Sequence, residues 1–565
     1  MRRRTDSAIR GRPHKVVRVG ASHQGVVARV VDSVPVESVP GVAGAGPAVD
    51  SPPDGRRAGW TVRLVSSALV RVAPPVAVLS VAAFLRFWQL TRVGFNSDEA
   101  VYAGTAGSIA GDQSLRSMFP VFRAHPVLFQ LALSLTGTGR PTDFAARALP
   151  AALGVLTVLV TYLLGQRLYG RPAGLLAALV LAVMPYHVLV SRQVLLDGPM
   201  TMAATVALYC VARYAGSTRP RWLIAAGGMM GLTVLVKETS VVLLGGLYAF
   251  FALTATVRVR LRHALAALAV MVLVVVPYPL VLTLSGRAGT GENYLLWQIF
   301  RPANHPLWFY GTVVPPAIGL AVLAAAALGS VWLRREGTWR ERLLLCWIAV
   351  PVAFFSLWPV KGYQYLLPIA PPLAVLAGRA LSRLPSLQAI AARRWLGRVT
   401  VVAATLGTVV SLAVPAWAQV NPTPTGTFLA GTGGLPGGRE AGQWVRANVP
   451  IGAQLLAIGP SMANVLEYYG GRRVYALSVS PNPKDRNPTY VPVPNPDLSL
   501  RRGEFQYVVW DSYTADRASF FASKARRLAD KYHGVAVYTG TISVRAKSGH
   551  PVTQPVIVIY QVRAA

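Results

Sequence analysis

The chain has 565 residues and a formal net charge of +34, yet only 14% of its residues are charged and 53% are hydrophobic. A soluble globular protein has about 25% charged residues, so the composition predicts a polytopic membrane protein. The basic residues gather in the N-terminal tail and at the ends of apolar runs, as topology signals do, and this excludes nucleic acid as a partner. The two cysteines, Cys210 and Cys346, lie inside apolar segments, so no disulfide framework is expected.

The first part of the chain, residues 1–71, is expected to be a disordered basic tail. It contains twelve Arg or Lys residues, is rich in Gly, Pro, Ser and Val, and shows no lasting helical or strand period. We expect it to stay in the cytoplasm and to touch anionic lipid. Its hydrophobic run comes too late for an ordinary cleaved signal peptide.

Apolar runs long enough to cross a bilayer follow the tail, and together they form an expected transmembrane domain over residues 72–418. A shorter run, 126–138, ends in Gly and Thr and is expected to form an interfacial helix inside the first outer loop, 91–143. The eleven expected spans lie near 72–90, 144–165, 172–190, 198–213, 222–236, 239–256, 264–284, 308–333, 343–358, 364–381 and 399–418.

The charge of the connecting segments predicts the orientation of these spans. With the N-terminus inside, the inner connections contain fifteen Arg residues, whereas the short outer connections contain only five Arg or Lys residues. Counting 126–138 as a further span would exchange the sides of all later connections and place most of their positive charge outside. The positive-inside rule therefore favours eleven spans, a cytoplasmic N-terminus and an outer C-terminus.

This orientation brings several ionisable residues to the outer face, where they are expected to line one cavity. The central stretch is 94–102, which contains the adjacent carboxylates Asp98 and Glu99. Adjacent residues point about 100° apart on a helix, so the two need not do the same job. A carboxylate near basic partners suits a general base for a hydroxyl group. Alternatively, Asp98 merely caps an interfacial helix that begins at Glu99.

The amino-acid composition of the chain changes after about residue 419. Pro and Gly predict a flexible linker over 419–438, and a soluble α/β domain is expected over 439–565. The Pro-rich segment 480–496 is expected to be a surface loop. The α/β domain as a whole is expected to bind an acceptor, to cover the cavity or to be purely structural. Its expected helices lie near 439–448, 461–469 and 516–531, and its strands near 454–458, 473–479, 505–510, 534–542 and 555–562.

Several motifs, in order and on the same face, resemble the dolichyl-phosphate-mannose–protein mannosyltransferases and their bacterial relatives, including the aminoarabinose transferases, within the C-type glycosyltransferase superfamily. The likeness covers roughly residues 80–385. Gln364 stands where the family often has Arg. The matching residues are Asp98-Glu99 followed by Tyr102, His125-Pro-Val-Leu, Arg147-Ala-Leu-Pro-Ala, Ser191-Arg192 with Asp197, and Lys361-Gly-Tyr-Gln-Tyr365-Leu-Leu-Pro.

The resemblance implies an inverting glycosyltransferase that moves a sugar, mannose or a pentose, from a polyprenyl-phosphate donor to an acceptor hydroxyl on the outer face of the plasma membrane. The catalytic residues would then be Asp98 as general base, with Glu99. The donor phosphate and lipid would be bound by His125, Arg192, Lys361 and Tyr365, and the residues that support the site or orient the acceptor would be Tyr102, Arg147 and Asp197.

Other roles stay open for these residues. Arg192 and Lys361 are also explained as snorkelling side chains at helix ends, and Tyr365 as part of the membrane aromatic belt. Arg147 is expected to hold the Asp98 loop by an ion pair, and Asp197 to pair with Arg192 or to cap a helix. Lys237 and Glu238 are expected to pair with each other.

No cofactor is expected, because no His and carboxylate residues cluster at metal-ligand spacing, although a divalent metal stays open since relatives differ. The expected acceptor is a cell-envelope glycan, lipid or protein. The competing function is a transporter or flippase of a lipid-linked sugar, but the matching broken helices that such a protein often has in its two halves are not seen.

Overall fold

The computed structural model describes residues 55–122, 124–336, 338–384, 394–422, 434–545 and 550–564. The chain divides into two compact units, Met1–Leu64 and Val65–Ala565. Most of the expected tail lies outside the described residues. Helix α1 (Gly55–Phe87) begins at Gly55 and not near residue 72, so the expectation of disorder is wrong for 55–71. No proline interrupts the chain between Pro53 and Pro74, and the helix therefore continues through this stretch.

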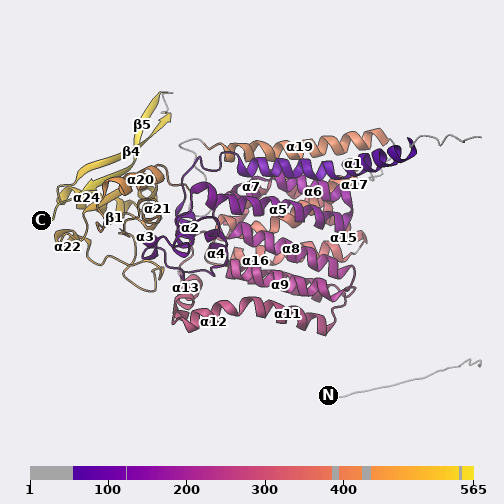
Figure 1. Cartoon of the computed structure of the whole chain (residues 1–565), viewed down its shortest axis with the longest axis horizontal. Coiled ribbons are helices and arrows are strands. Elements are labelled where there is room, and N and C mark those ends of the chain that lie inside the picture. Colours follow the sequence, from indigo (N-terminus) through magenta and orange to yellow (C-terminus); the bar gives the residue numbers. More distant parts are fainter. Residues whose placement is uncertain are drawn as a thin grey trace, which may run out of the picture. The chain divides into compact units, whose positions relative to one another are not determined.

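Each apolar run that was expected to span the membrane coincides with one helix or with consecutive helices (Figure 1). After α1 these are α5 (Asp143–Tyr169), α6 (Arg171–Val183), α7 (Pro185–Ser191), α8 (Asp197–Ala215), α9 (Pro220–Val236), η1 (Glu238–Val241), α10 (Val242–Leu253), α11 (Leu261–Val275), α12 (Pro277–Leu284), α14 (Phe309–Ile318), α15 (Leu320–Glu336), α16 (Trp339–Leu357), η2 (Tyr363–Ile369), α17 (Ala370–Arg383) and α19 (Arg394–Val420).

Two of these pairs are sharply bent. Helices α6 and α7 meet at 61° just before Pro185, and α14 and α15 meet at 93° around Gly319, which has a φ of 95°. Among the described residues, four helices are long and apolar enough to cross a membrane, or six if each bent pair is one span. The protein is thus a helical membrane protein, and the count of eleven spans stays a prediction.

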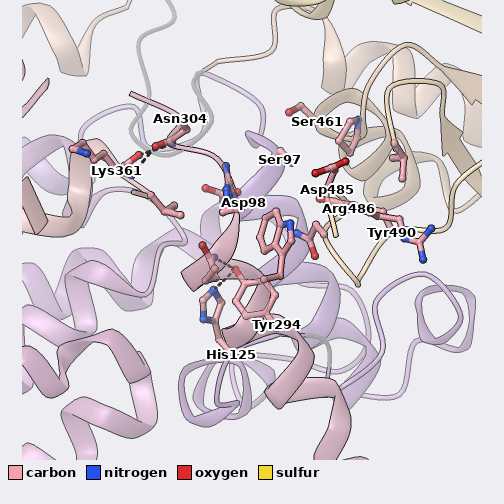
Figure 2. A pocket seen from close by; sticks show the side chains of 18 of the residues that line it. Ser97, Asp98, His125, Tyr294, Asn304, Lys361, Ser461, Asp485, Arg486 and Tyr490 are labelled. Atoms are coloured by element: carbon pink, nitrogen blue, oxygen red, sulfur yellow. Dashed lines mark hydrogen bonds between the residues drawn. The ribbon is translucent and has the colours of Figure 1, made fainter. Parts of the chain in front are cut away.

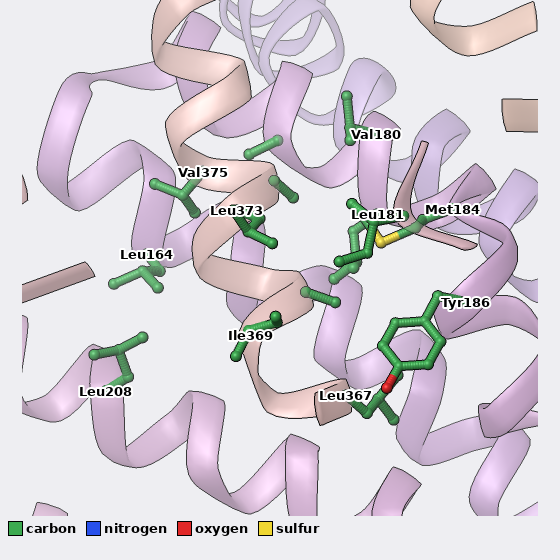
Figure 3. Packing of buried hydrophobic residues seen from close by; sticks show 14 of the residues in the cluster. Leu164, Val180, Leu181, Met184, Tyr186, Leu208, Leu367, Ile369, Leu373 and Val375 are labelled. Carbon is green, nitrogen blue, oxygen red and sulfur yellow. The ribbon is translucent and has the colours of Figure 1, made fainter. Parts of the chain in front are cut away.

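Small residues allow the helices to approach closely. A Cβ atom added to Gly378 in α17 would lie 2.5 Å from the carbonyl oxygen of Ala173 in α6, so no larger side chain fits there without a shift. Around this contact lies the largest apolar cluster. Figure 3 shows Leu181 and Met184 near the end of α6, facing Leu373 and Ile369 of the η2–α17 segment.

The first outer loop carries three short helices, α2 (Ser97–Ile109), α3 (Gln113–Arg116) and α4 (Leu128–Ser134). The prediction of a short helix within 126–138 is confirmed by α4. A further helix, α13 (Ala288–Phe300), lies in the outer connection 285–307. The first of them, α2, carries the acidic pair.

The C-terminal segment forms a five-stranded sheet in the order β2-β1-β3-β5-β4. Strands β1, β2 and β3 pair in parallel, whereas β5 pairs antiparallel with β3 and β4. All five predicted strands and three predicted helices are present. The elements are α20 (Gly438–Asn448), β1 (Leu455–Ala457), α21 (Pro460–Gly470), β2 (Val474–Ala476), α22 (Pro496–Arg501), β3 (Tyr507–Asp511), α23 (Ser512–Arg517), α24 (Ser519–Lys531), β4 (Val535–Arg545) and β5 (Pro551–Gln561).

One face of this sheet shares its core with the first outer loop. A single cluster of buried side chains joins Phe95 and Ala100 of the loop to Val465 and Tyr468 of α21. The opposite face packs on α24 in a separate cluster. The α/β segment is therefore built onto the loop that carries the acidic pair, and most of the expected linker between this segment and α19 lies outside the described residues.

Candidate functional site

The acidic pair lies in the first turn of α2, and a capping box defines that turn. The Asn96 side chain accepts a hydrogen bond from the Glu99 backbone amide at 2.9 Å, and the Glu99 carboxylate accepts one from the Asn96 amide at 3.1 Å. Asn96 is thus the cap of α2. The alternative, that Asp98 caps a helix beginning at Glu99, is wrong.

Glu99 is fully buried and committed to internal contacts. Its carboxylate accepts hydrogen bonds from Arg147 at 2.7 and 2.6 Å and from the backbone amide of Val194 at 3.1 Å. The ion pair that was expected of Arg147 is present, and the same guanidinium also donates to the carbonyls of Leu90 and Val93. Because its oxygens are all engaged, Glu99 holds the loop in shape, and its expected catalytic role does not fit the geometry.

Asp98 faces a cavity of about 460 Å³ instead. Of the described residues, none donates a hydrogen bond to its carboxylate or forms an ion pair with it. Burial raises the pKa of Asp98 to about 6, against the opposite effect of Lys237 and His125. An unengaged carboxylate with a pKa just below neutral is suited to accept a proton.

Two of the lining residues, Lys237 and His125, belong to ion pairs. Lys237 donates to Asp197 at 2.7 Å, and His125 Nδ1 contacts Glu238 at 2.9 Å. The expected pairing of Lys237 with Glu238 is therefore wrong, as is that of Asp197 with Arg192, because each acidic residue reaches a partner on another element. Asp197 is the first residue of α8 and not its cap, which is Leu196.

The motif at Lys361 forms a second wall. Lys361 and Tyr365 both line the cavity, and the ring of Tyr365 lies 4.1 Å from Lys237 Nζ. Asn304 fixes the Lys361 backbone, since its carboxamide accepts from the Lys361 amide and donates to the Lys361 carbonyl, each at 2.8 Å. The Lys361 ammonium donates to a carbonyl at 2.8 Å and has no carboxylate partner among the described residues. Its charge is thus available to an anion.

Arg192 lies elsewhere, and its expected role in donor binding does not fit its position. Its guanidinium donates to the carbonyls of Leu85 and Trp88, both at 2.7 Å, where α1 ends. A cation at a helix C-terminus satisfies free carbonyls and interacts favourably with the helix dipole. Arg192 is also absent from the described lining of the cavity.

Further lining residues were missed by the sequence analysis. Arg301 and Tyr294 come from the outer connection 285–307, and Asp485, Arg486 and Tyr490 come from the Pro-rich segment expected to be a surface loop. In Figure 2, Asp98 lies between Lys361 and Asn304 on one side and the residues of this segment on the other. A Pro-rich segment carries no periodicity that indicates which surface it covers, so only the fold reveals its place.

The other expected site residue, Tyr102, lines the cavity next to Asp98. Burial raises the pKa of its phenol well above the usual value, so it stays a hydrogen-bond donor at neutral pH. In the described part of the chain, no group of three or more His, Cys, Asp or Glu side chains is placed to hold a metal ion.

The family model of the dolichyl-phosphate-mannose–protein mannosyltransferases matches residues 124–281. The undecaprenyl phosphate-alpha-4-amino-4-deoxy-L-arabinose arabinosyl transferase of Pectobacterium carotovorum is 28% identical over 257 residues, 43% of this chain and 46% of the relative. The transferase of the same name from Pseudomonas aeruginosa is 31% identical over 42% of this chain and 46% of its own length. The resemblance to this family is confirmed.

The solved structures agree on the fold. The aminoarabinose transferase ArnT of Cupriavidus metallidurans matches 90% of this chain and 98% of its own length, with a TM-score of 0.59 and 16% identity. An archaeal oligosaccharyltransferase from Archaeoglobus fulgidus matches with a TM-score of 0.54 and 15% identity, over 86% of this chain and 74% of its own. The fold is thus that of the C-type glycosyltransferases, while the sequence match spans about half the length of the curated relatives.

Proposed function

We propose that the protein is an inverting glycosyltransferase that moves a sugar from a polyprenyl-phosphate donor to an acceptor hydroxyl. The observation that carries this proposal is Asp98, an unengaged carboxylate with a pKa of about 6, in a cavity that also contains Lys361 and Arg301. The sequence relatives of the chain are named undecaprenyl phosphate-alpha-4-amino-4-deoxy-L-arabinose arabinosyl transferases, and one solved structure of ArnT is bound to undecaprenyl phosphate.

In this reaction Asp98 is the general base. The acceptor oxygen attacks the anomeric carbon while its proton passes to the Asp98 carboxylate, and the bond from that carbon to the phosphate oxygen breaks with its electron pair on the phosphate. The leaving phosphate gains charge, which Lys361 and Arg301 stabilise in a partly water-excluded cavity. Asp197 holds Lys237 near the same place, so Lys237 contributes positive potential but not a free ammonium.

The donor sugar is a pentose or mannose and the acceptor is a cell-envelope glycan, lipid or protein. We propose no required metal, since Asp98 and the two cations supply the base and the charge stabilisation. Activity that persists in EDTA supports this part of the proposal, and restoration of a lost activity by a divalent ion contradicts it.

The proposed topology has eleven spans within residues 72–418, a cytoplasmic N-terminus, a linker over 419–438 and a soluble α/β domain over 439–565 outside the plasma membrane. Single cysteines placed at exposed positions in a background without Cys210 and Cys346 test it with an impermeant maleimide. We expect labelling of intact cells at Asp485 but not at Arg258. Labelling with the opposite sidedness contradicts the orientation.

Transfer from radiolabelled polyprenyl-phosphate sugars tests the function, in membranes that contain wild type, Asp98→Asn or Asp112→Asn. Asp112 is a matched control because it lies in the same loop and pairs with Arg140 outside the cavity. We expect wild type and Asp112→Asn to label an acceptor and Asp98→Asn to lose at least about 100-fold in rate. Equal labelling by Asp98→Asn contradicts the base, and movement of the donor across the membrane without transfer favours a transporter.

A further inference from the structure

A second, smaller cavity of about 90 Å³ borders Asp98. It shares with the large cavity a partition that includes Asp98, Tyr102, His125 and Tyr490. The residues that belong to it alone come from α2, from α4 and from the chain between them, with Thr489 from the C-terminal segment. One carboxylate therefore has access to two spaces.

The described linings of the two cavities differ in charge. Lys237, Arg301, Lys361 and Arg486 line only the large one. Of the described residues that line the small one, none is Lys or Arg, and its own polar groups are the neutral side chains Thr105, Gln130 and Thr489. The large cavity thus fits an anionic group, and the small one fits an uncharged group that forms hydrogen bonds.

Gln130 gives a separate indication that the small cavity receives a polar ligand. The residue is 4% exposed, yet its Oε1 has no hydrogen-bond partner. An unsatisfied buried acceptor destabilises the folded state, so such a group is expected to meet a donor in the working state. Thr105 lies on α2, and its hydroxyl already donates to the Val101 carbonyl at 2.9 Å, which leaves its oxygen able to accept.

We propose that the small cavity is the subsite of the acceptor hydroxyl, with Gln130 and Thr105 as its specificity-determining residues. This inference rests on the proposed glycosyl transfer and adds to it the side from which the acceptor enters. In an inverting reaction the nucleophile and the leaving phosphate lie on opposite faces of the anomeric carbon. A base that borders both a cavity lined by cations and a second cavity without a described Lys or Arg meets this requirement, because the acceptor proton reaches Asp98 without passing the phosphate.

The volume limits what enters. The small cavity has about 90 Å³ against about 460 Å³ for the large one, which is enough for one hydroxyl-bearing arm of an acceptor and too little for a lipid chain. The acceptor class is therefore an uncharged alcohol at the point of attack, such as a sugar hydroxyl or a hydroxylated side chain, whatever charge lies farther from it.

Partition of the donor sugar between glycerol and water tests the subsite in the purified full-length protein. The products are glycosyl-glycerol, formed by attack of glycerol, and free sugar, formed by attack of water. Because water depends less than an alcohol on the contacts of the subsite, the ratio of glycosyl-glycerol to free sugar reports the binding of glycerol as a surrogate acceptor. The variants are Gln130→Met and Thr105→Val, which keep size and remove the polar group. Thr161→Val is the control, because Thr161 is also a buried threonine that donates to the carbonyl four residues before it, far along α5.

We expect both cavity variants to lower the ratio about five- to tenfold, with the inhibition constant of undecaprenyl phosphate unchanged, and Thr161→Val to behave as wild type. If either variant folds and its ratio of glycosyl-glycerol to free sugar is unchanged, the assignment of the small cavity as the acceptor subsite is wrong. If the variants weaken undecaprenyl phosphate instead, the cavity belongs to the donor and the inference fails. A wild type that turns over no polyprenyl-phosphate sugar contradicts the proposed function itself, and the subsite with it.

Discussion

At the scale of single residues, the main result is that two adjacent carboxylates have opposite environments. Glu99 is surrounded by donors and pairs with Arg147, whereas Asp98 faces a cavity and no described residue donates a hydrogen bond to its carboxylate. A rotation of about 100° between neighbours on a helix accounts for this division. Glu99 stabilises the loop, and Asp98 is available to a ligand.

The pH dependence of Asp98 has a definite sign. Burial raises the pKa of Asp98 from 3.8 to about 6. Between pH 3.8 and pH 6 the folded state therefore binds more protons than the unfolded state, and the free energy of unfolding falls as pH rises. We expect the transfer rate to rise through pH 6 and then level off. Asp98→Asn should raise Tm above pH 6 and leave it unchanged below pH 4, and a lower Tm at pH 7.5 contradicts this assignment.

Glu99 should behave differently on substitution. Glu99→Ala leaves the buried Arg147 guanidinium without its anion, and breaking a buried pair in this way costs about 3–5 kcal/mol. We expect a large fall in Tm in detergent solution together with lost activity. The matched control is Asp112→Ala, which breaks the more exposed pair with Arg140 and should change Tm little. A stable but inactive Glu99→Ala would instead support a direct catalytic role.

At the scale of elements, the cavity is closed by the segments that connect the long helices and by the Pro-rich segment. The connection 285–307 contributes Arg301, the turn before η2 contributes Lys361, and the Pro-rich segment contributes Arg486. Asn304 joins the first two through both of its hydrogen bonds to the Lys361 backbone. The position of each cation thus depends on a neighbouring loop.

The cations should act on the lipid phosphate. We expect Arg301→Gln and Lys361→Gln each to weaken inhibition by undecaprenyl phosphate about tenfold, with a smaller dependence on salt. Arg287→Gln, in the same connection but outside the described lining of the cavity, should have no such effect. Equal inhibition constants for Arg287→Gln and Lys361→Gln would show that the cavity does not bind the phosphate.

At the scale of the whole molecule, the α/β segment and the first outer loop share one core and a polar seam. The Tyr469 hydroxyl accepts from the Phe95 amide and donates to Asp143, both at 2.9 Å, and Asn464 donates to Ser97 next to Asp98 at 2.9 Å. A shared core of this kind makes the α/β segment part of the site.

Truncation tests this dependence. A chain ending after residue 421 should expose the apolar face of α2 and lose both activity and monodispersity in detergent, because the cluster around Phe95 and Tyr468 is then opened. Tyr469→Phe is a milder test that removes one hydroxyl and should reduce the rate more than the donor affinity. A truncated chain that retains transfer would show that the segment is dispensable.

The sequence predicted much of the fold but less of the site. The apolar runs, the short helix near 128–134 and all five strands were predictable, because each follows from local composition and periodicity. The pairing of Asp197 with Lys237 and the wall formed by Arg486 were not, because they depend on which distant segments meet. Asp98 was predicted to line a cavity and does so, while Arg192 matched a motif but lies at a helix end.

The shared core also has a consequence for biosynthesis. Phe95 and Asp98 leave the ribosome about 370 residues before the α21 side chains that complete their surroundings. At about 5–20 residues per second, the first outer loop waits tens of seconds with its apolar face uncovered. Completion of the cavity around Asp98 is therefore among the last events of synthesis, and a nascent chain stalled before residue 460 contains helices α1 to α19 but no finished cavity.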